Sequence, residues 1–563
     1  MKKFICILAL CLSVSAFAQK TLSKDYDFKV SQPYKVFDAN MKYYFARENE
    51  AISVKFNGAK LAIQKFDTQK PALIKQNDYE KVLPKNYHVE DVLDVNGSLY
   101  IFFSSWNGDD DKEQLFGQQI DFATGEFTGT PKLLFQVNGK VTALEKTNKT
   151  VDANIDRSSF FMNVPAVPDK FEILQSFDKK NILVQYRKRP EVKRDVKSYD
   201  IIGLYAFDGS LNKISGKELK MPYTERRMNN IDYQVDNNGT LYMLTKVFHD
   251  DSNAQKKKKN DTIANYHIEL FTIKSGAEKI DISKFENNNR FVNKIWIFDT
   301  NTDYLVCGGL YSNGKGMGTT GIFGGDPVGI DDADGLLVFK ISKDGAMYDY
   351  HYYDIPVEIL NQFENEDVQR TNKKNDDKGE VAKFLGLELK DLNVQNDGSI
   401  ILVGEQTYSV PHMAGTSSGY TSFHYADILA TKINADGKLA WMKKIPKAQK
   451  GVNGKGGMSY KYFNANNGHY FVFLDNVKNI DLSLDKSPAE HLDGKGGYLT
   501  AVKITDADGK LTKGSILNAK EVADYKIYQF STNRIFKTSE KAFMFEAYKK
   551  AKEDIVIRID LNK

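Results

Sequence analysis

The chain has 563 residues, of which 41% are hydrophobic, 27% are charged and 12% are aromatic. This composition supports one large or two ordinary globular cores and excludes a disordered chain. The 78 basic and 74 acidic side chains are mixed along the sequence and leave a net charge of only +4, so we expect no nucleic-acid partner.

The first 18 residues have the three parts of an export signal. Lys2 and Lys3 form a positive start, Phe4–Val14 is a short apolar run, and Ala16-Phe17-Ala18 is a cleavage site of the A-x-A type. Leu8-Ala9-Leu10-Cys11 is a weaker match to a lipoprotein signal, because Leu10 is bulky where a small residue is needed. We therefore predict a signal peptide over 1–18 and an exported protein that is periplasmic, outer-membrane-associated or secreted.

Two of the three cysteines, Cys6 and Cys11, lie within this signal. The third, Cys307, ends the apolar run Tyr304–Cys307, and we expect it to be a small buried core residue instead of a reactive thiol. No later segment is long and apolar enough to predict a transmembrane helix.

A repeated turn motif indicates the architecture of residues 19–563. In three plain copies, Phe339–Gly345, Thr431–Gly437 and Val502–Gly509, a strand runs into an Asp-Gly turn. Asp-Gly favours a hairpin because glycine accepts the positive φ of a tight turn. Weaker copies of the motif are Lys55–Gly58, Gln119–Gly125, Tyr205–Gly209 and Thr272–Gly276, and the chain ends in a related strand, Val556–Lys563, that lacks a hairpin partner.

A second strand precedes each copy and follows its own tight turn. Asn96-Gly97 introduces Leu99–Phe103, and Asp397-Gly398 introduces Ile400–Val403, with a further strand such as Val89–Val95 before the turn. Each unit is therefore predicted to be a four-stranded antiparallel meander.

We predict an all-β protein with a single β-propeller domain, because radial packing of such sheets buries both of their faces. Eight four-stranded blades are expected, and seven is the alternative. The N-terminal segment Tyr26–Phe37 is expected to pair with Asp554–Leu561 and close the ring.

The long insertions are predicted to project from one face of the propeller. We call the four strands of each blade a to d, from the propeller axis outward. The a–b and c–d turns are short, whereas long segments fall between strands b and c or between blades. The main insertions cover about 138–170, 312–334 and 355–386, the last with a helix expected over Val357–Val368, and Ser409–Ala426 is expected to be another long loop. Rigid scaffolds commonly present binding loops in this way.

Catalytic motifs are not apparent in the sequence. Gly316–Gly321 matches G-x-G-x-x-G, but no helix follows it, and we interpret it as a glycine-rich loop. No G-x-S-x-G or closely spaced metal-binding histidine motif occurs, so we predict no catalytic residue, no cofactor and no metal. Two facing carboxylates for glycoside hydrolysis remain open, since that geometry does not depend on sequence spacing.

Aromatic residues and histidines in the long loops are the candidate contacts for a partner or ligand. Aromatic side chains supply a large contact area at a low entropy cost. His412 and His424 share one predicted loop with Tyr408 and Tyr420, where they could form a small-molecule or metal site or simply pack the loop. The full set of candidates is Trp106, Tyr311, Phe323, Tyr408, His412, Tyr420 and His424.

The segments Asn393–Ser399 and Val403–Tyr408 resemble repeat units of secreted β-propellers from Bacteroidetes-type envelopes. This resemblance implies a propeller fold and an envelope location, and it carries no catalytic residue. The long loops, the high aromatic content and the lack of a catalytic motif lead us to predict a non-enzymatic binding scaffold in an outer-membrane-associated assembly, with envelope proteins bound on the long-loop face. The alternative is a carbohydrate-binding or glycoside-cleaving propeller.

Overall fold

The computed structural model describes residues 22–562 except 85, 143–154, 157–168, 190–196, 259–260, 278, 288, 314–332, 379–383, 415–416, 453–457 and 467. The predicted signal peptide lies outside these residues, as do Phe323 and most of the 138–170 and 312–334 insertions.

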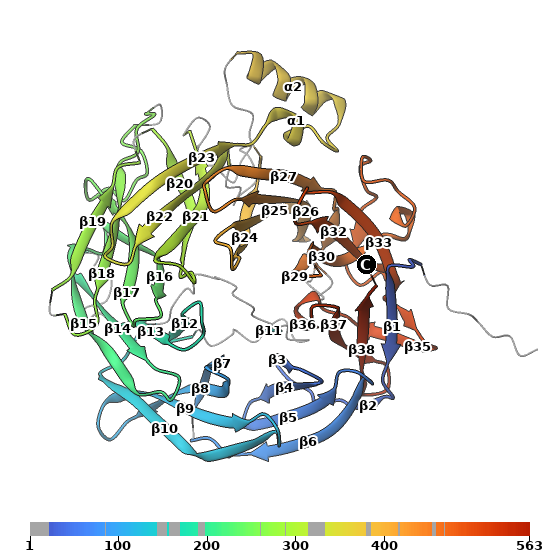
Figure 1. Cartoon of the computed structure of the whole chain (residues 1–563), viewed down its shortest axis with the longest axis horizontal. Helices are drawn as coiled ribbons and strands as arrows, with labels where there is room; N and C mark the ends of the chain where they lie inside the picture. The colour runs from blue at the N-terminus through green and yellow to red at the C-terminus, as the bar shows by residue number, and fades with distance from the viewer. Residues whose placement is uncertain are drawn as a thin grey trace, which may run out of the picture.

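Across the described residues, the strands form eight sheets that stand around a central axis (Figure 1), and their pairings are antiparallel except for one short parallel pair. We call them blades 1 to 8 in chain order. The first four blades consist of β3 (Met41–Arg47), β4 (Glu50–Asn57), β5 (Lys60–Asp67) and β6 (Ala72–Glu80); β7 (His88–Val95), β8 (Ser98–Asn107), β9 (Lys112–Asp121) and β10 (Glu126–Asn138); β12 (Glu172–Gln175), β13 (Ile182–Arg187), β14 (Tyr199–Phe207) and β15 (Lys213–Thr224); and β16 (Met228–Val235), β17 (Leu241–Phe248), β18 (Tyr266–Ile273) and β19 (Asp281–Phe285).

The remaining blades continue the same order from the axis outward. They consist of β20 (Phe291–Phe298), β21 (Tyr304–Ser312), β22 (Gly335–Ser342) and β23 (Met347–Asp354); β24 (Leu387–Val394), β25 (Ile400–Ala414), β26 (Ser417–Ile433) and β27 (Leu439–Ile445); β29 (Tyr460–Ala465), β30 (Gly468–Asp475), β32 (Tyr498–Thr505) and β33 (Leu511–Asn518); and β36 (Ile535–Ser539), β37 (Ala542–Lys549), β38 (Glu553–Leu561) and β1 (Tyr26–Val30).

Short elements decorate these sheets. They are β2 (Tyr34–Lys35) on β38, β11 (Ile155–Asp156) on β3, β28 (Gln449–Gly451) on β26, β31 (His491–Leu492) on β28, β34 (Glu521–Val522) on β35 (Tyr525–Gln529), and the 3₁₀ turns Val477–Asn479 and Thr532–Arg534.

The hydrophobic core is divided among the gaps between neighbouring blades. Apolar side chains alternate between the two faces of each sheet, so every blade contributes to two clusters. The cluster that joins blade 8 to blade 1 contains Tyr44, Phe66, Phe536 and Val556, and Tyr44 stacks on Phe536 at 5.2 Å. The predicted propeller of four-stranded antiparallel blades is confirmed.

The N-terminal strand closes the ring, as predicted. β1 pairs antiparallel with β38, from Tyr26 opposite Leu561 to Val30 opposite Ile557, and becomes the outer strand of blade 8. Buried charges reinforce the junction between blades 8 and 1. The Lys55 ammonium lies 2.6 Å from the Glu546 carboxylate, and both side chains are fully buried.

The repeat alignment of blade 1 was wrong by one strand. The repeat motif predicts that Lys55–Gly58, like the other copies, is the third strand of its blade with the following turn, but Lys55 lies in the second strand, β4, and Gly58 begins the turn between the second and third strands. The reason is the shortness of that turn, which makes blade 1 look like the c–d hairpin of the other units.

The 355–386 insertion contains two short helices instead of the one expected over Val357–Val368. α1 covers Val357–Leu360 and α2 covers Glu366–Asp377; the Asn365 side chain caps α2 by accepting from the Asp367 and Val368 N–H groups. Polar side chains such as Asn365 favour caps over helix interiors, which divides the predicted helix. The helices lie outside the ring beside blade 6 (Figure 1), where the Lys444 ammonium donates to the Leu360 carbonyl oxygen at 3.1 Å. The described part of this insertion therefore lies against the rim of the ring, and not on one face of the propeller as expected.

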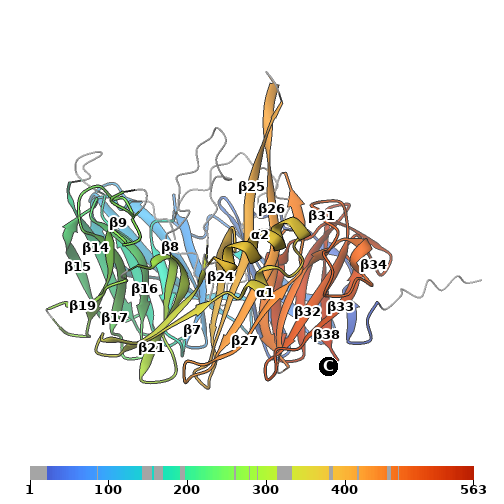
Figure 2. The ribbon, with the colours of Figure 1, turned by 90° about the horizontal axis from the view of Figure 1, so that it is seen from above.

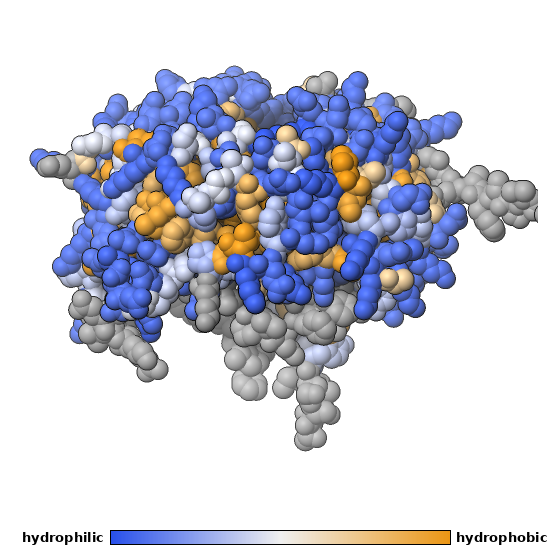
Figure 3. All heavy atoms as spheres, turned by 90° about the horizontal axis from the view of Figure 1, so that it is seen from below, coloured by the Kyte–Doolittle hydropathy of each residue, from blue (hydrophilic) through white to orange (hydrophobic). Residues whose placement is uncertain are grey.

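Cys307 is fully buried in the cluster between blades 4 and 5, as expected. The side of the ring that carries β6 and β10 is largely hydrophilic with scattered apolar patches (Figure 3), and the exposed Ile74 and Leu133 lie on these strands. Within the described residues, no helix has the length and apolar character needed to span a bilayer.

Candidate binding site

A two-stranded ribbon rises from blade 6 well beyond the other strands (Figure 2). β24 accompanies β25 only as far as Gln406, and β27 accompanies β26 only from Ile428 onward. Between these points β25 and β26 continue to pair with each other up to Ala414 opposite Ser417. We call the described residues 407–414 and 417–426 the ribbon; at about 3.3 Å per residue it adds roughly 25 Å to the blade.

The ribbon replaces the long loop that was predicted over Ser409–Ala426. Its strands alternate between two faces, as any β-ribbon does. The sequence did carry the signal of a ribbon, because Tyr408 and His412, like Tyr420 and His424, are four residues apart and so lie on one face of a strand.

One side of the ribbon, which we call the histidine face, brings together four of the predicted contact residues. Tyr408 lies opposite His424 and His412 lies opposite Tyr420. Each pair stacks: the ring centroids are 4.6 Å apart for Tyr408 and His424, and 4.5 Å apart for His412 and Tyr420. Such cross-strand ring pairs stabilise a ribbon that lacks sheet neighbours.

Ser422 lies between the two histidines on the same face. Its hydroxyl oxygen is 2.8 Å from the His412 Nε2 and 3.0 Å from the His424 Nε2. Because a hydroxyl has only one proton, at least one imidazole must donate its own Nε2–H to Ser422. The serine therefore fixes the orientation of both rings.

The base of the ribbon is braced by other strands and by charge. β28 pairs with Phe423–Tyr425, and the His424 Nδ1 lies 3.5 Å from the Glu490 carboxylate just before β31. Burial lowers the pKa of His424 below its usual value, although Glu490 opposes this shift. The imidazole of His424 is therefore mainly neutral at pH 7.

The chemistry of this cluster favours binding over catalysis. Ser422 and the two histidines have the residue types of a nucleophile and its bases, but Ser422 is fully buried between the rings. A nucleophilic hydroxyl must reach a substrate carbon and a set of oxyanion donors. What the ribbon offers to solvent is aromatic surface: Tyr420 is 51% exposed on the histidine face, and Phe423 is 45% exposed on the opposite face.

The other predicted contact residues do not join this cluster. Trp106 lies at the end of β8 in blade 2, across the ring from blade 6 (Figure 1), and the Lys140 ammonium is 5.3 Å from its ring centroid. Tyr311 is fully buried in blade 5, where its hydroxyl donates to Asp354, so it is not a surface contact. Its position in an alternating strand, β21, directs it into the core.

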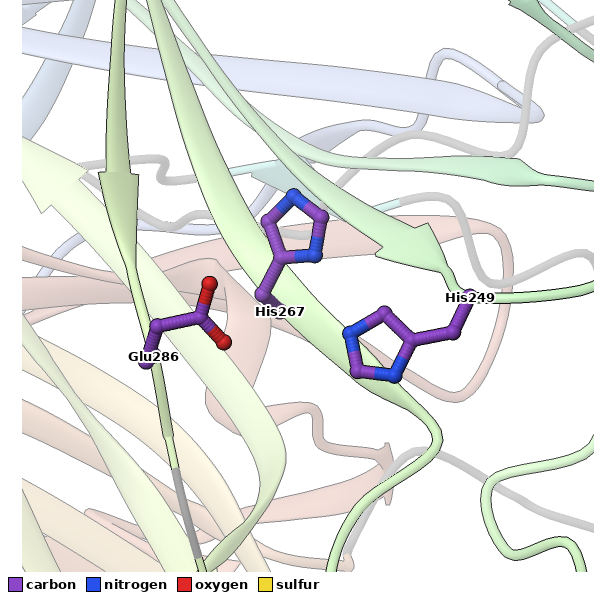
Figure 4. Close-up of side chains that lie close together, drawn as sticks. All are labelled: His249, His267 and Glu286. Carbon is purple, nitrogen blue, oxygen red and sulfur yellow. The ribbon is translucent and has the colours of Figure 1, made fainter.

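A second cluster was missed by the sequence analysis. His249, His267 and Glu286 follow or begin three successive strands of blade 4, and their potential ligand atoms all lie within 4.8 Å of one another (Figure 4). Their spacing along the sequence matches no metal motif. Each residue does stand at the same edge of a meander, which is the signal that could have identified them.

Comparisons with known proteins do not assign the chain to a family. No family model and no curated protein matches the chain. Solved structures with similarity include the WD40 domain of SCAP from fission yeast (7% identity, TM-score 0.36, 96% of this chain and 95% of that one) and an uncharacterised protein from Listeria monocytogenes EGD-e (8%, 0.34, 81% and 91%). Another is a prolyl endopeptidase (10%, 0.34), of which this chain spans about half, 54%, with 93% of its own length. These values are too low to carry an argument, and the fold assignment depends on the sheet topology.

Proposed function

We propose that this protein is a non-enzymatic binding scaffold of the bacterial cell envelope, and that the ribbon of blade 6 holds a protein partner. The observation that carries the proposal is a ribbon that extends beyond its blade with exposed aromatic side chains on both of its faces. An isolated two-stranded ribbon is only marginally stable in water, so a chain gains little stability by extending one.

The geometry of the ribbon supports a protein partner. Tyr420 and Phe423 are three residues apart and point to opposite faces, so a partner could enclose the ribbon and bury both rings. The stacked histidines and Ser422 hold the shape of the ribbon before binding, which lowers the entropy cost of association. Aromatic anchors of this kind dominate the binding energy of many protein interfaces.

The envelope location is part of the same proposal. It is supported by the export features of residues 1–18, with a basic start, an apolar run and an A-x-A site. An outer-membrane-associated assembly is the setting that such an exported scaffold would serve.

The test is affinity capture of the protein from gently solubilised native envelopes, with the captured partners quantified by mass spectrometry. We expect at least one envelope protein in near-stoichiometric amount, and a loss of about tenfold or more from the Tyr420→Ala, Phe423→Ala double variant. The matched control is Tyr528→Ala in β35, which removes a 63% exposed ring from blade 8.

Capture that is equal for the native protein and the double variant would refute the role of the ribbon. Recovery of the native protein alone would refute the scaffold proposal, and recovery with bound glycan would favour the carbohydrate-binding alternative.

A further inference from the structure

Three metal-ligating side chains meet at the edge of blade 4. His249 directly follows β17, His267 is the second residue of β18, and Glu286 directly follows β19. The strand register explains their proximity. Val247 pairs with His267, which places His249 two residues further on the same face, and Ile268 pairs with Phe285, which brings Glu286 opposite His267.

The orientation of His267 is fixed by a carboxylate behind it. Its Nε2 lies 2.9 Å from the Glu269 Oε1, and the same oxygen accepts from the Tyr223 hydroxyl at 2.8 Å and lies 3.2 Å from the Lys284 ammonium. A carboxylate can only accept, so the proton of His267 is on Nε2 and the lone pair is on Nδ1. Metal-binding histidines commonly have this arrangement, with one nitrogen on a carboxylate and the other on the ion.

The free nitrogen of His267 points into the cluster. Figure 4 shows Nδ1 on the side of the imidazole that faces His249, while Nε2 points away from both His249 and Glu286. Nδ1 is buried and has no hydrogen-bond partner among the described residues. A buried acceptor without a partner is destabilising, and an ion bound there would supply the missing partner.

We propose that His249, His267 and Glu286 bind one divalent transition-metal ion of the zinc type. Two imidazoles and one carboxylate suit Zn²⁺ and related ions, whereas Ca²⁺ and Mg²⁺ prefer oxygen ligands alone. His267 is the fixed ligand. His249 and Glu286 are exposed, so their side chains can rotate inward to close the present separations to metal-binding distances.

The ion would retain an open coordination position. Three protein ligands leave the fourth tetrahedral position to water or to a group from another molecule. His249 also begins the insertion that returns to the blade at Asn265, where its N–H donates to the Asn265 carbonyl oxygen. Metal binding would therefore tie the start of this insertion to the end of β19.

A comparable cluster between blades 2 and 3 has its side chains already paired with one another, with Ser104 or with the backbone. His88, Glu90 and Asp169 also lie close together. There, however, His88 is bound to Asp169 at 3.0 Å, and Glu90 accepts from Ser104 and from the N–H groups of Lys170 and Phe171. These contacts already occupy the carboxylate oxygens of Glu90, so we assign no metal to this cluster.

The proposal is tested by titrating purified protein, free of any histidine tag, with Zn²⁺ in a calorimeter and with Co²⁺ in a spectrophotometer. We expect one equivalent of Zn²⁺ to bind, and one equivalent of Co²⁺ to give the visible absorption of a four- or five-coordinate ion. His249→Gln and Glu286→Gln should each weaken Zn²⁺ binding by at least about tenfold; both residues are exposed, so folding is not at risk.

The positioning role of Glu269 has a separate readout. Glu269→Gln should weaken Zn²⁺ binding by roughly 10–100-fold and change the Co²⁺ spectrum, because it alters how His267 is held. His351→Gln is the matched control, since His351 contacts one carboxylate, that of Asp349, at 2.8 Å in blade 5 and should not affect binding.

No stoichiometric binding by the native protein, or equal binding by the native protein and His249→Gln, would overturn the proposal. An equal loss in the His351→Gln control would also overturn it, because the binding would then be nonspecific.

Discussion

Lys55→Met should destabilise the closure of the propeller ring more than the loss of any exposed ion pair would. Lys55 is in blade 1, and it lies 2.6 Å from Glu546 and 3.7 Å from Asp554 in blade 8, with all three side chains fully buried. Removing the ammonium leaves the Glu546 carboxylate buried with Lys42 as a more distant cation at 3.6 Å. Removing one partner of a buried ion pair lowers the free energy of unfolding by about 3–5 kcal/mol.

This cost can be converted into a melting-temperature shift. Roughly 500 ordered residues at about 2.1 cal/mol/K each give an unfolding entropy near 1 kcal/mol/K, so the variant should melt about 3–5 °C lower. The assay is differential scanning fluorimetry, with scanning calorimetry to establish whether the ring unfolds in one transition.

The control for this prediction has the same distance but a different burial. Lys75 lies 2.6 Å from Glu126 on the surface, with side chains 41% and 53% exposed. Exposed pairs contribute about 0–1 kcal/mol, so Lys75→Met should shift melting by about 1 °C or less. Equal shifts for Lys55→Met and Lys75→Met would refute the reasoning. Lys55→Met with Glu546→Gln should recover part of the loss, because both charges are then gone.

Two further predictions concern pH and backbone strain. Burial raises the pKa of Asp506, but hydrogen bonds from Lys432, His469 and Gln395 prevail and lower it from 3.8 to about 2. Its stabilisation is therefore present above about pH 4 and is lost as the pH falls toward 2. The melting-temperature difference between the native protein and Asp506→Asn should shrink over that interval, and a difference that stays constant would contradict this. Gly345 and Gly276 both have positive φ in c–d turns, but a Cβ on Gly345 would lie 2.3 Å from the Thr272 hydroxyl whereas one on Gly276 meets nothing within 4 Å. Urea denaturation should show a loss for Gly345→Ala that exceeds the loss for Gly276→Ala by about 1–3 kcal/mol, and equal losses would refute the steric argument.

The fold could be predicted because the strand and turn signals are local. Asp-Gly turns and apolar alternation marked the blades, and the last strand, β38, which has no hairpin partner after it, pointed to the N-terminal segment as its outer neighbour. Blade 1 was misaligned because its b–c turn at Gly58 has the form of a c–d hairpin, and sequence spacing alone does not distinguish the two.

The candidate sites were harder to predict because they depend on contacts between strands. The stacking of Tyr408 on His424 needs the register of the ribbon, which a loop assignment concealed. His249 and Glu286 are far apart in sequence and meet only because β18 lies between β17 and β19. Tyr311 was misjudged for the related reason that its place next to an insertion suggested exposure, whereas strand alternation buries it.

Site-specific photo-crosslinking in living cells tests the central claim, that the ribbon binds the partner. A photoreactive phenylalanine analogue would replace Tyr420 or Phe423 on the ribbon, or Tyr348, which is 42% exposed beside the c–d turn of blade 5. We predict one crosslinked envelope protein from positions 420 and 423 and none from position 348. A crosslink from position 348, with none from the ribbon, would contradict the account.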